Sequence, residues 1–459
     1  MSSEETPLLQ EHHDDIYERF TSRQKRGLIA IVICGGLVTF FTVVAILPSI
    51  LQMAKDFNTT GEVIGYAVSV TILASAVGGL IGARYAKFYG RRPCYLYNLP
   101  IMVIGSLGTA FAQTVPQLII WRFLQAMGVA PFTSVGAGVI GDIYKLEERG
   151  AVLGTYFGIG LLGLAISPTI SGIVAHHWSW RVVHLGLAIF ASAAFILIFF
   201  CFPETSHPGS RDIDKYGDAG KSLPKWRPVI LNPLTPLAML RSPIILSVSI
   251  ITCVALLTDF ALMIPLAFTI GKRYEIDDEA TLGLFLLPIG FGNAVGAPIS
   301  GWISDKMVIH YKAKRQYWYP EDRLRAALFG AYLPITVFAS AFVTEYIAGR
   351  LGIILNLVIF FFNGFGTDIV LTAYGAYVVD VVHSNSAEVT AAVNTPRAIL
   401  LAISSTALLP MINAYGQLVT NACVAVLVTL GFILSVLLVV YGDTLRALVD
   451  IGYSTADTN

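Results

Sequence analysis

Long apolar runs alternate with short polar segments along the chain. Each of twelve runs comes close to the roughly 20 apolar residues that an α-helix needs to cross the hydrocarbon layer of a membrane. The runs lie at residues 27–51, 63–83, 95–112, 117–140, 151–175, 182–202, 244–270, 280–303, 326–344, 351–379, 389–411 and 416–441. The pattern predicts an all-α membrane protein with twelve transmembrane helices.

A polar stretch at residues 203–242, rich in proline, glycine and charge, divides the runs into six and six. Such a composition is typical of a surface linker. We therefore expect two six-helix bundles, at residues 27–202 and 243–441, joined by this linker and flanked by tails at 1–26 and 442–459. Basic clusters follow the second run of each half, in "GARYAKFYGRRP" (82–93) and after "GWISDK" (301–306). This repetition indicates the internal repeat that is usual in secondary transporters.

Composition supports the membrane prediction. The sequence is 55% hydrophobic and only 13% charged, whereas soluble domains carry about 25% charged residues. Thirty basic and thirty acidic residues cancel, so no net basic field favours nucleic acid. Most lysines and arginines fall on one side if the amino terminus is cytosolic, which predicts that both termini are cytosolic.

Neither the cysteines nor the first residues suggest other chemistry. Five isolated cysteines, without the close spacing of a metal or redox site, predict no metal and no cofactor. The first 26 residues lack an apolar core, so we expect no cleavable signal peptide. They contain "EETPLL" (4–9), an acidic dileucine pattern that resembles sorting signals for vacuoles or lysosomes.

The fifth run contains an unusual set of small residues in "GLLGLAISPTISG" (160–172). Helices in membranes associate through close packing, which small residues permit, and Pro168 frees a backbone carbonyl and can bend the helix. Gly154, Gly163, Pro168 and Gly172 are therefore candidates for a helix interface. A static helix crossing is an alternative to a moving one.

The same stretch resembles the antiporter signature of the fifth helix in the major facilitator superfamily. Gly154, Gly163, Pro168 and Gly172 match that signature, and small serines replace two of its glycines. Further segments resemble family motifs in the correct order: "WRFLQAMG" (121–128), "GDIYKLEERGAVLG" (141–154) and "YGRRP" (89–93). Within the superfamily, the chain resembles most the fungal twelve-span drug:proton antiporters. This resemblance is carried by "PET" (203–205) and "YVVDVVHSNSAEVTAAVNTPRAIL" (377–400).

This resemblance carries expectations about gating residues. The signature loop after the second helix normally has an aspartate where this chain has Lys87, which puts the usual gating pair of the first half in doubt. Asp305 matches the acidic position in the second half. Arg91 and Arg92, with Asp305, are candidates for a cytosolic gate. The alternative is that the two arginines only enforce topology.

Four ionisable residues lie within predicted spans, where an isolated charge costs about 2.5 to 3.5 kcal/mol on insertion scales. Asp259 sits in "LLTDFALMIP"; desolvation would let its carboxylate bind and release a proton, or it is a hydrogen-bonded structural residue. Asp368 follows "FFNGFGT", which suits a bent gating helix; a salt bridge with Arg397 is the alternative. Arg122 stays charged, so it can modulate an acid or hold an anionic group, or it only bridges helices.

Two further features are weaker. Adjacent His176 and His177 suggest a metal or a pH sensor, yet with no Cys, Asp or Glu nearby in the sequence we expect them to be solvated. Asn58 begins a glycosylation sequon on the predicted outer side, in a short loop where we expect it to be unused.

The expected function follows mainly from the resemblance. It implies a proton-coupled antiporter that exports drugs or small amphipathic metabolites, with cationic amines as one substrate class. Expected partners are a small-molecule substrate, protons and the lipid bilayer, in a monomer of the plasma or vacuolar membrane. A proton symporter importing a polar nutrient is an alternative. A non-transporting nutrient receptor is another, disfavoured by the short tail after Tyr441. The sequence has no nucleophile with a matching base and no paired metal ligands, so we do not expect an enzyme.

Overall fold

The computed structural model describes residues 19–449 except 145, 208, 210, 215–228, 230, 318 and 383–385. Within helices, the side chains of residues 134, 137, 146–151, 153–155, 157, 158, 161, 386 and 387 are also not described. The dileucine pattern at 4–9, both tails beyond these limits, much of the linker and the contacts of Gly154 therefore lie outside the described residues.

The first half consists of α-helices that follow the first six predicted runs. α2 (Ser22–Val44), a short 3₁₀ turn η1 (Leu47–Ser49) and α3 (Ile50–Asp56) form the first crossing. Next come α4 (Gly61–Tyr89), α5 (Arg91–Ala110), α6 (Val115–Val129) and α7 (Pro131–Ile143). α8 (Leu146–His177) and α9 (Trp180–Cys201) complete this half. The fourth predicted run is divided at Pro131, which lacks the N–H group that a continuous helix would use.

The second half begins with a 3₁₀ segment, η2 (Thr235–Arg241), inside the predicted linker. α11 (Pro243–Met263) is followed by a π-helical turn η3 (Ala267–Gly271) and α12 (Lys272–Tyr274). The remaining elements are α13 (Glu279–Arg315), η4 (Pro320–Gly330), α14 (Leu333–Tyr346), α15 (Gly349–Val381), α16 (Ser386–Tyr415) and α17 (Gln417–Leu448). The seventh predicted run is not one α-helix, because Pro265 lacks an N–H and the chain continues as a π turn.

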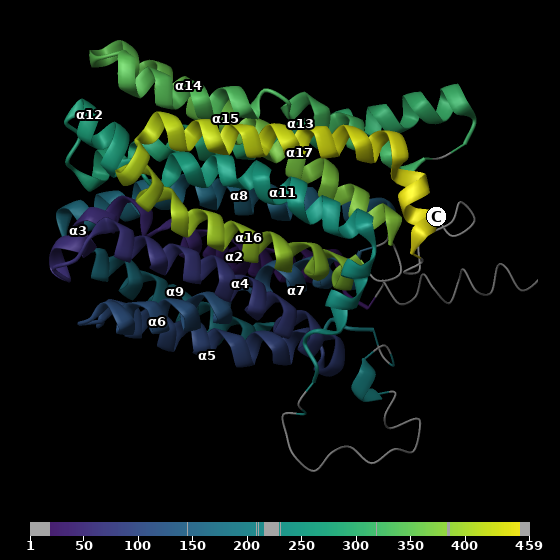
Figure 1. The fold of residues 1–459 in the computed structure, drawn as a ribbon. Helices are drawn as coiled ribbons and strands as arrows, with labels where there is room; N and C mark the ends of the chain where they lie inside the picture. Colours follow the sequence, from purple (N-terminus) through teal and green to yellow (C-terminus); the bar gives the residue numbers. More distant parts are fainter. Residues whose placement is uncertain are drawn as a thin grey trace, which may run out of the picture.

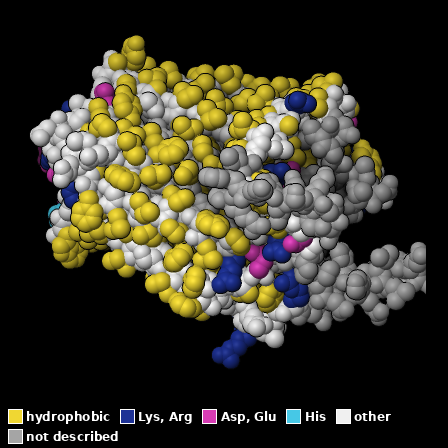
Figure 2. Space-filling model, turned by 90° about the horizontal axis from the view of Figure 1, so that it is seen from below, with side chains coloured by type: hydrophobic (Ala, Val, Ile, Leu, Met, Phe, Trp, Pro, Cys, Tyr) yellow, Lys and Arg dark blue, Asp and Glu magenta, His cyan; other side chains and the backbone are white. Residues whose placement is uncertain are grey.

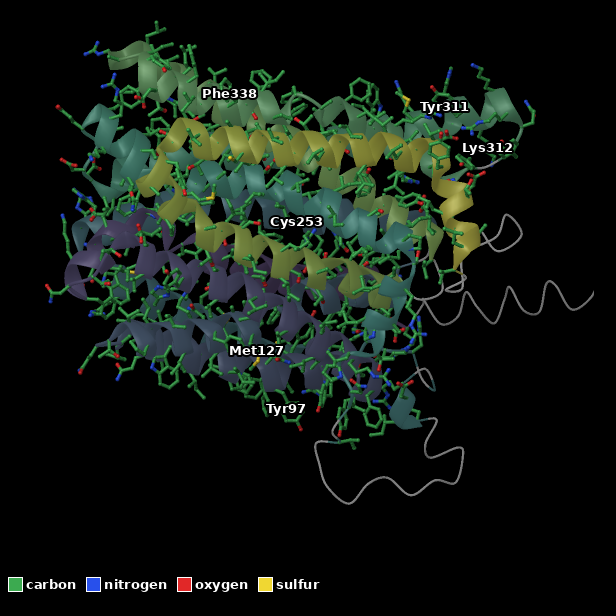
Figure 3. All side chains as sticks on the ribbon, in the orientation of Figure 1. Tyr97, Met127, Cys253, Tyr311, Lys312 and Phe338 are labelled. Carbon is green, nitrogen blue, oxygen red and sulfur yellow. The ribbon has the colours of Figure 1, made fainter. Side chains whose placement is uncertain are left out.

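Helical structure coincides with all twelve predicted runs. Among the described residues, ten helical segments are long and apolar enough to cross a membrane. α5 and α8, of 20 and 32 residues, occupy the positions of the two other runs. Large apolar side chains such as Tyr97 of α5 and Phe338 of α14 point outward on opposite sides of the molecule (Figure 3). Figure 2 shows one face largely covered by hydrophobic side chains, with charged side chains gathered toward its ends.

The helices form two halves that meet along two seams. α2 to α9 pack together, as do α11 to α17, and Figure 1 shows the halves side by side. α4 packs against α16 in one seam, and α8 packs against α13 in the other. We call the end that carries Arg19, the linker and Leu448 the linker end. The opposite end, which carries the α8–α9 and α16–α17 connections, is called the far end.

The small residues of the fifth run lie between two neighbouring helices. Facing α13, the carbonyl oxygen of Pro168 lies where a side chain at Gly283 would have to go, and Thr169 Oγ1 donates a hydrogen bond to Gly283 O at 3.1 Å. Facing α2, Ser167 Oγ donates to Phe41 O at 3.1 Å, and a side chain at Gly163 would meet Leu37. α8 thus contacts its own half on one face and the opposite half on the other.

Candidate functional site

Asp259 is the centre of a buried polar cluster in the second half. Its side chain, on α11, is 3% exposed. Asn363 Nδ2 and Thr367 Oγ1 of α15 donate to its Oδ1 at 2.7 and 2.9 Å, and Asn293 Nδ2 of α13 donates to its Oδ2 at 3.2 Å. These three donors offset part of the desolvation cost of a buried carboxylate.

Asp368 follows Thr367 on α15 and is 4% exposed. In contrast to Asp259, its Oδ2 has no hydrogen-bond partner among the described residues. Asp368 directly follows Thr367, whose hydroxyl donates to Asp259, so the two carboxylates belong to one cluster. The second half therefore holds two buried acids in unlike surroundings, one with three donors and one with an unpaired oxygen.

Glycines bring the elements of this cluster together. A side chain at Gly364 of α15 would meet the carbonyl oxygen of Ile289 on α13, and one at Gly292 of α13 would meet that of Phe361 on α15. The backbones of α13 and α15 therefore touch, which small residues permit in membranes. This contact places Asn293 and Asn363 beside the carboxylate of α11.

Arg397 does not pair with Asp368 in the described part of the chain. It is half-buried on α16, which packs against α11. Cys253 of α11 lies near the middle of the molecule (Figure 3). The alternative expected from the sequence, a salt bridge between Asp368 and Arg397, is therefore not present in the described structure.

A second buried polar cluster surrounds Arg122 in the first half. Its Nη1 donates to Thr42 O at 3.0 Å and to Gln125 Oε1 at 2.7 Å. Gln125 Nε2 in turn donates to Ser106 Oγ at 2.8 Å and lies 3.4 Å from His184 Nδ1. Arg122 is fully buried. Its Nε and Nη2 atoms have no hydrogen-bond partner within the residues that the structure covers.

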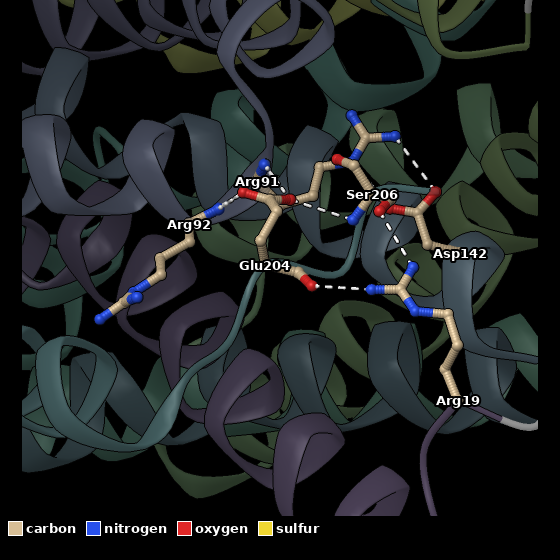
Figure 4. Close-up of polar contacts among 6 residues, drawn as sticks. All are labelled: Arg19, Arg91, Arg92, Asp142, Glu204 and Ser206. Atoms are coloured by element: carbon tan, nitrogen blue, oxygen red, sulfur yellow. Dashed lines mark hydrogen bonds and ion pairs between the residues drawn. The ribbon is translucent and has the colours of Figure 1, made fainter. Parts of the chain in front are cut away.

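Charged residues at the linker end of the first half form a third cluster (Figure 4). Arg91 Nε donates to Asp142 Oδ2 at 3.0 Å, joining α5 to the end of α7. The Glu204 carboxylate accepts the backbone N–H groups of Arg91 and Arg92 at 2.9 and 3.1 Å, so it caps the N-terminus of α5. Burial disfavours the charge of Arg91, but Asp142 outweighs that effect and leaves the pKa of Arg91 above its ordinary value. The guanidinium therefore stays charged.

The second half has a related cluster at the same end. Arg323 of η4 donates to Asp305 Oδ1 of α13 at 2.8 Å and to Asp380 Oδ2 of α15 at 2.7 Å. Arg323 thus occupies the place that Arg91 has in the first half, and Asp380 that of Asp142. The counterpart of Asp305 is Lys87, which cannot repeat the contact because its charge has the opposite sign. Lys87 instead lies 2.7 Å from Glu388 of α16, across the seam between the halves.

The structure thus groups the sequence candidates and adds residues that the sequence did not single out. Asp259 and Asp368 lie together, Arg122 belongs to a separate cluster, and Arg91, Arg92 and Asp305 lie at the linker end. The additional residues are Asn293, Asn363, Thr367, Gln125, His184, Asp142, Glu204, Arg323, Asp380 and Glu388. Five of them lie in segments that resemble family motifs: Gln125 in "WRFLQAMG", Asp142 in "GDIYKLEERGAVLG", Glu204 in "PET", and Asp380 and Glu388 in the segment 377–400. Across the described ranges, no group of three metal-ligating side chains comes together.

Two halves of apolar helices, each with buried charged residues in its interior, define a multi-pass membrane protein of the transporter class. A model of the Major Facilitator Superfamily matches residues 32–405. The chain belongs to this superfamily, a family of transporters and not of enzymes. This confirms the family and the all-α membrane fold expected from the sequence.

Curated fungal proteins are similar over parts of the chain. The MFS antiporter QDR3 of Candida albicans is 30% identical over 186 residues, 40% of this chain and 27% of that protein. Quinidine resistance protein 1 of Saccharomyces cerevisiae is 24% identical over 67% of this chain and 58% of its own length. The MFS-type transporter penM of Penicillium rubens is 27% identical over 90% of this chain and 84% of its own. The alignment with QDR3 thus spans about a quarter of that relative.

Proposed function

We propose that the protein is a proton-coupled antiporter that exports amphipathic organic molecules, including cationic amines, as its two halves rock about the bound substrate. The observation that carries this proposal is the pair of buried acids in the second half. Asp259 receives three hydrogen-bond donors, whereas Asp368 keeps an oxygen without a partner in the described structure. One acid is thus supported as an anion and the other as the protonated form.

The exchange can be described in terms of charge. When Asp368 carries a proton, the cluster holds one negative charge; when it loses that proton, the cluster holds two and attracts a cation. Protonation and binding of a substrate ammonium group therefore compete for the same charge, which is what antiport requires. A proton entering down the membrane potential supplies about 2.3 kcal/mol per 100 mV.

Arg122 has a separate role in the proposal. Its guanidinium is buried with two nitrogen atoms unpartnered among described residues, so any anionic or carbonyl group of the substrate that reaches it gains a charge-assisted hydrogen bond. Substrates with a basic amine at one end and an acceptor at the other match both clusters. Two of the relatives are named as an antiporter and a quinidine resistance protein, which supports this class.

Orientation and location are part of the same proposal. Basic residues concentrate at the linker end, which the positive-inside rule assigns to the cytosol. The protein then acts as a monomer in the plasma or vacuolar membrane, with protons entering from the far end.

Reconstituted protein tests the proposal directly. Quinidine, a basic amine, is the first probe, followed by a panel of amphipathic amines; uptake into liposomes is followed with and without an imposed pH gradient. We expect gradient-driven uptake that Asp259→Asn and Asp368→Asn abolish and that Glu345→Gln, at an exposed acid of the far end, retains. Uptake of the whole panel that ignores the gradient, or coupling that survives in both aspartate variants, would show the proposal to be wrong.

A further inference from the structure

The far end of the α8–α13 seam carries a contact between opposite halves that involves the histidine pair. His176 lies in the last turn of α8, and Glu279 lies in the first turn of α13. His176 Nδ1 is 3.7 Å from Glu279 Oε2. The two helices are held close here because Gly172, one turn before His176, leaves room for the Glu279 carbonyl oxygen. His176 is therefore not simply solvated, as the sequence suggested.

Further charges surround this contact. Asp278 caps α13 by accepting a hydrogen bond from Thr281 N at 2.7 Å. Burial favours protonation of Asp278, but the hydrogen bonds from Thr281 and the field of His176 outweigh it and lower its pKa below the ordinary value. Asp277 precedes it in the chain. The imidazole of His176 thus lies near two acids of the opposite half, Asp278 and Glu279.

α3 also packs near this point, because Gln52 Nε2 donates to Ala175 O at 3.1 Å. The acid of α3, Asp56, accepts a hydrogen bond from Trp180 Nε1 of α9 at 2.8 Å, so it is already engaged. The segment η1 contains only Leu47, Pro48 and Ser49. At the start of α9, the guanidinium of Arg181 lies over the ring of Trp180, 4.2 Å from its centroid. His177 packs edge-on against His176, with ring centroids 5.1 Å apart, and has no carboxylate partner among described residues.

The ends of the two helices stabilise the charges that attract one another across the seam. The C-terminus of α8 bears partial negative charge, which stabilises a protonated histidine in its last turn. The N-terminus of α13 bears partial positive charge, which stabilises Glu279 and Asp278. The side chain of His176 is 44% exposed, so protons from the far side reach it. Each of these effects strengthens attraction across the seam when the imidazole becomes charged.

We propose that His176 and Glu279 form a latch that closes the far end of the seam more tightly in acid. Opening toward the far side has to part α8 from α13, so it must break this contact. A histidine gains a positive charge on acidification, so the attraction between His176 and Glu279 increases as the pH falls. Because the pair is partly exposed, we expect the ratio of closed to open far ends to rise about two- to fivefold on acidification.

The latch can be measured without knowing the substrate. Spin labels at Phe111→Cys and Tyr346→Cys, at exposed far-end positions of the two halves, report the separation in lipid nanodiscs at pH 8 and pH 5. The native cysteines are first replaced by serine or alanine. We expect the closed fraction to rise in acid, and His176→Gln and Glu279→Gln to lose most of that rise. His177→Gln is the matched control and should keep it.

A fixed charge provides a second arm that does not depend on titration. His176→Lys should hold the far end closed at both pH values, and Glu279→Lys in that background should open it at both. An unchanged acid response in His176→Gln, or an acid response lost equally in His177→Gln, would overturn the latch. Either result leaves the proton-antiport proposal standing, because that proposal rests on Asp259 and Asp368.

Discussion

Lys87 Nζ lies 2.7 Å from Glu388 Oε1, and this ion pair joins α4 of the first half to α16 of the second at the linker end. Arg84 Nη1 approaches the same oxygen at 3.9 Å. Lys87 stands where the family signature resembled by this loop normally has an aspartate. The sequence departure is therefore matched by a partner of opposite sign on the other half.

Reversing both charges of this pair should be tolerated better than changing one of them. Lys87→Glu and Glu388→Lys should each open the linker end, because like charges then face one another. The double variant should restore part of the closure, because the lysine at position 388 pairs with the new glutamate but also faces Arg84. An exposed pair contributes about 0.2 to 1 kcal/mol, so the closed-to-open ratio should change up to about fivefold. The rate at which a thiol reagent modifies cysteines at the linker end measures this closed-to-open ratio. A double variant as open as either single variant would contradict an ion pair.

Asn363 should be essential to the acid pair and not only to packing. It donates to Asp259 and to Thr258, and Thr336 Oγ1 donates to its Oδ1 at 2.6 Å. Asn363→Ala leaves these groups unsatisfied and should cost about 1 to 3 kcal/mol of unfolding free energy. It should also shift the pH dependence of transport.

Asn356, two turns earlier on α15, is the control for this variant. Its side chain is equally buried and bonds Ser340, Thr344 and Gly352. Asn356→Ala should lower the midpoint of thermal unfolding by a similar amount but leave the pH profile unchanged. If the two alanine variants shift the pH profile equally, Asn363 has no special role at Asp259.

The seam between α8 and α13 should be sensitive to one methyl group. Gly283→Ala would collide with the carbonyl oxygen of Pro168, so we expect lower stability and slower transport. Gly301→Ala on the same helix is the matched comparison, because nothing lies within 4 Å of a side chain there. It should be neutral or stabilising by about 0.5 to 1 kcal/mol. The free energies of unfolding of the two variants, measured by tryptophan fluorescence, test this difference.

Arg122 and Arg91 should respond oppositely to replacement by methionine. Arg122→Met removes a buried cation whose Nε and Nη2 are unpartnered in the described structure, so stability should be kept or raised while transport is lost. Arg91→Met leaves Asp142 without its partner and should lower the free energy of unfolding by about 1 to 3 kcal/mol. A large stability loss in Arg122→Met would indicate that this arginine is mainly structural.

Apolar runs predicted the helices well because membrane insertion depends on local hydrophobicity. The ends were harder to predict. α13 continues to Arg315, beyond the run that ends at residue 303, because charged residues such as Lys306 and Lys312 form helix readily in water. Figure 3 shows Lys312 at this end of the molecule, away from the apolar middle. The hydropathy pattern therefore predicts only the apolar portion of such a helix.

The site was predictable only in part. A charged residue inside an apolar run can be recognised from the sequence alone, so Asp259, Asp368 and Arg122 could be predicted as site residues. Their surroundings depend on contacts between distant residues, such as Asn363 with Asp259, which lie 104 positions apart. Asparagine and threonine are common in such helices, and nothing in their local sequence tells which of them faces a carboxylate. The same reason hid Glu388, 301 positions from Lys87.

The connection between the halves has a mechanical consequence. Tyr85 and Tyr89 of α4 bond both backbone groups of Val229, at 3.0 and 2.8 Å, whereas η2, beginning at Thr235, packs on α11 and α16. The strap that passes from one half to the other is thus only residues 230–234, which span at most about 20 Å when stretched. A connection this short limits how far the linker ends of the two halves can move apart.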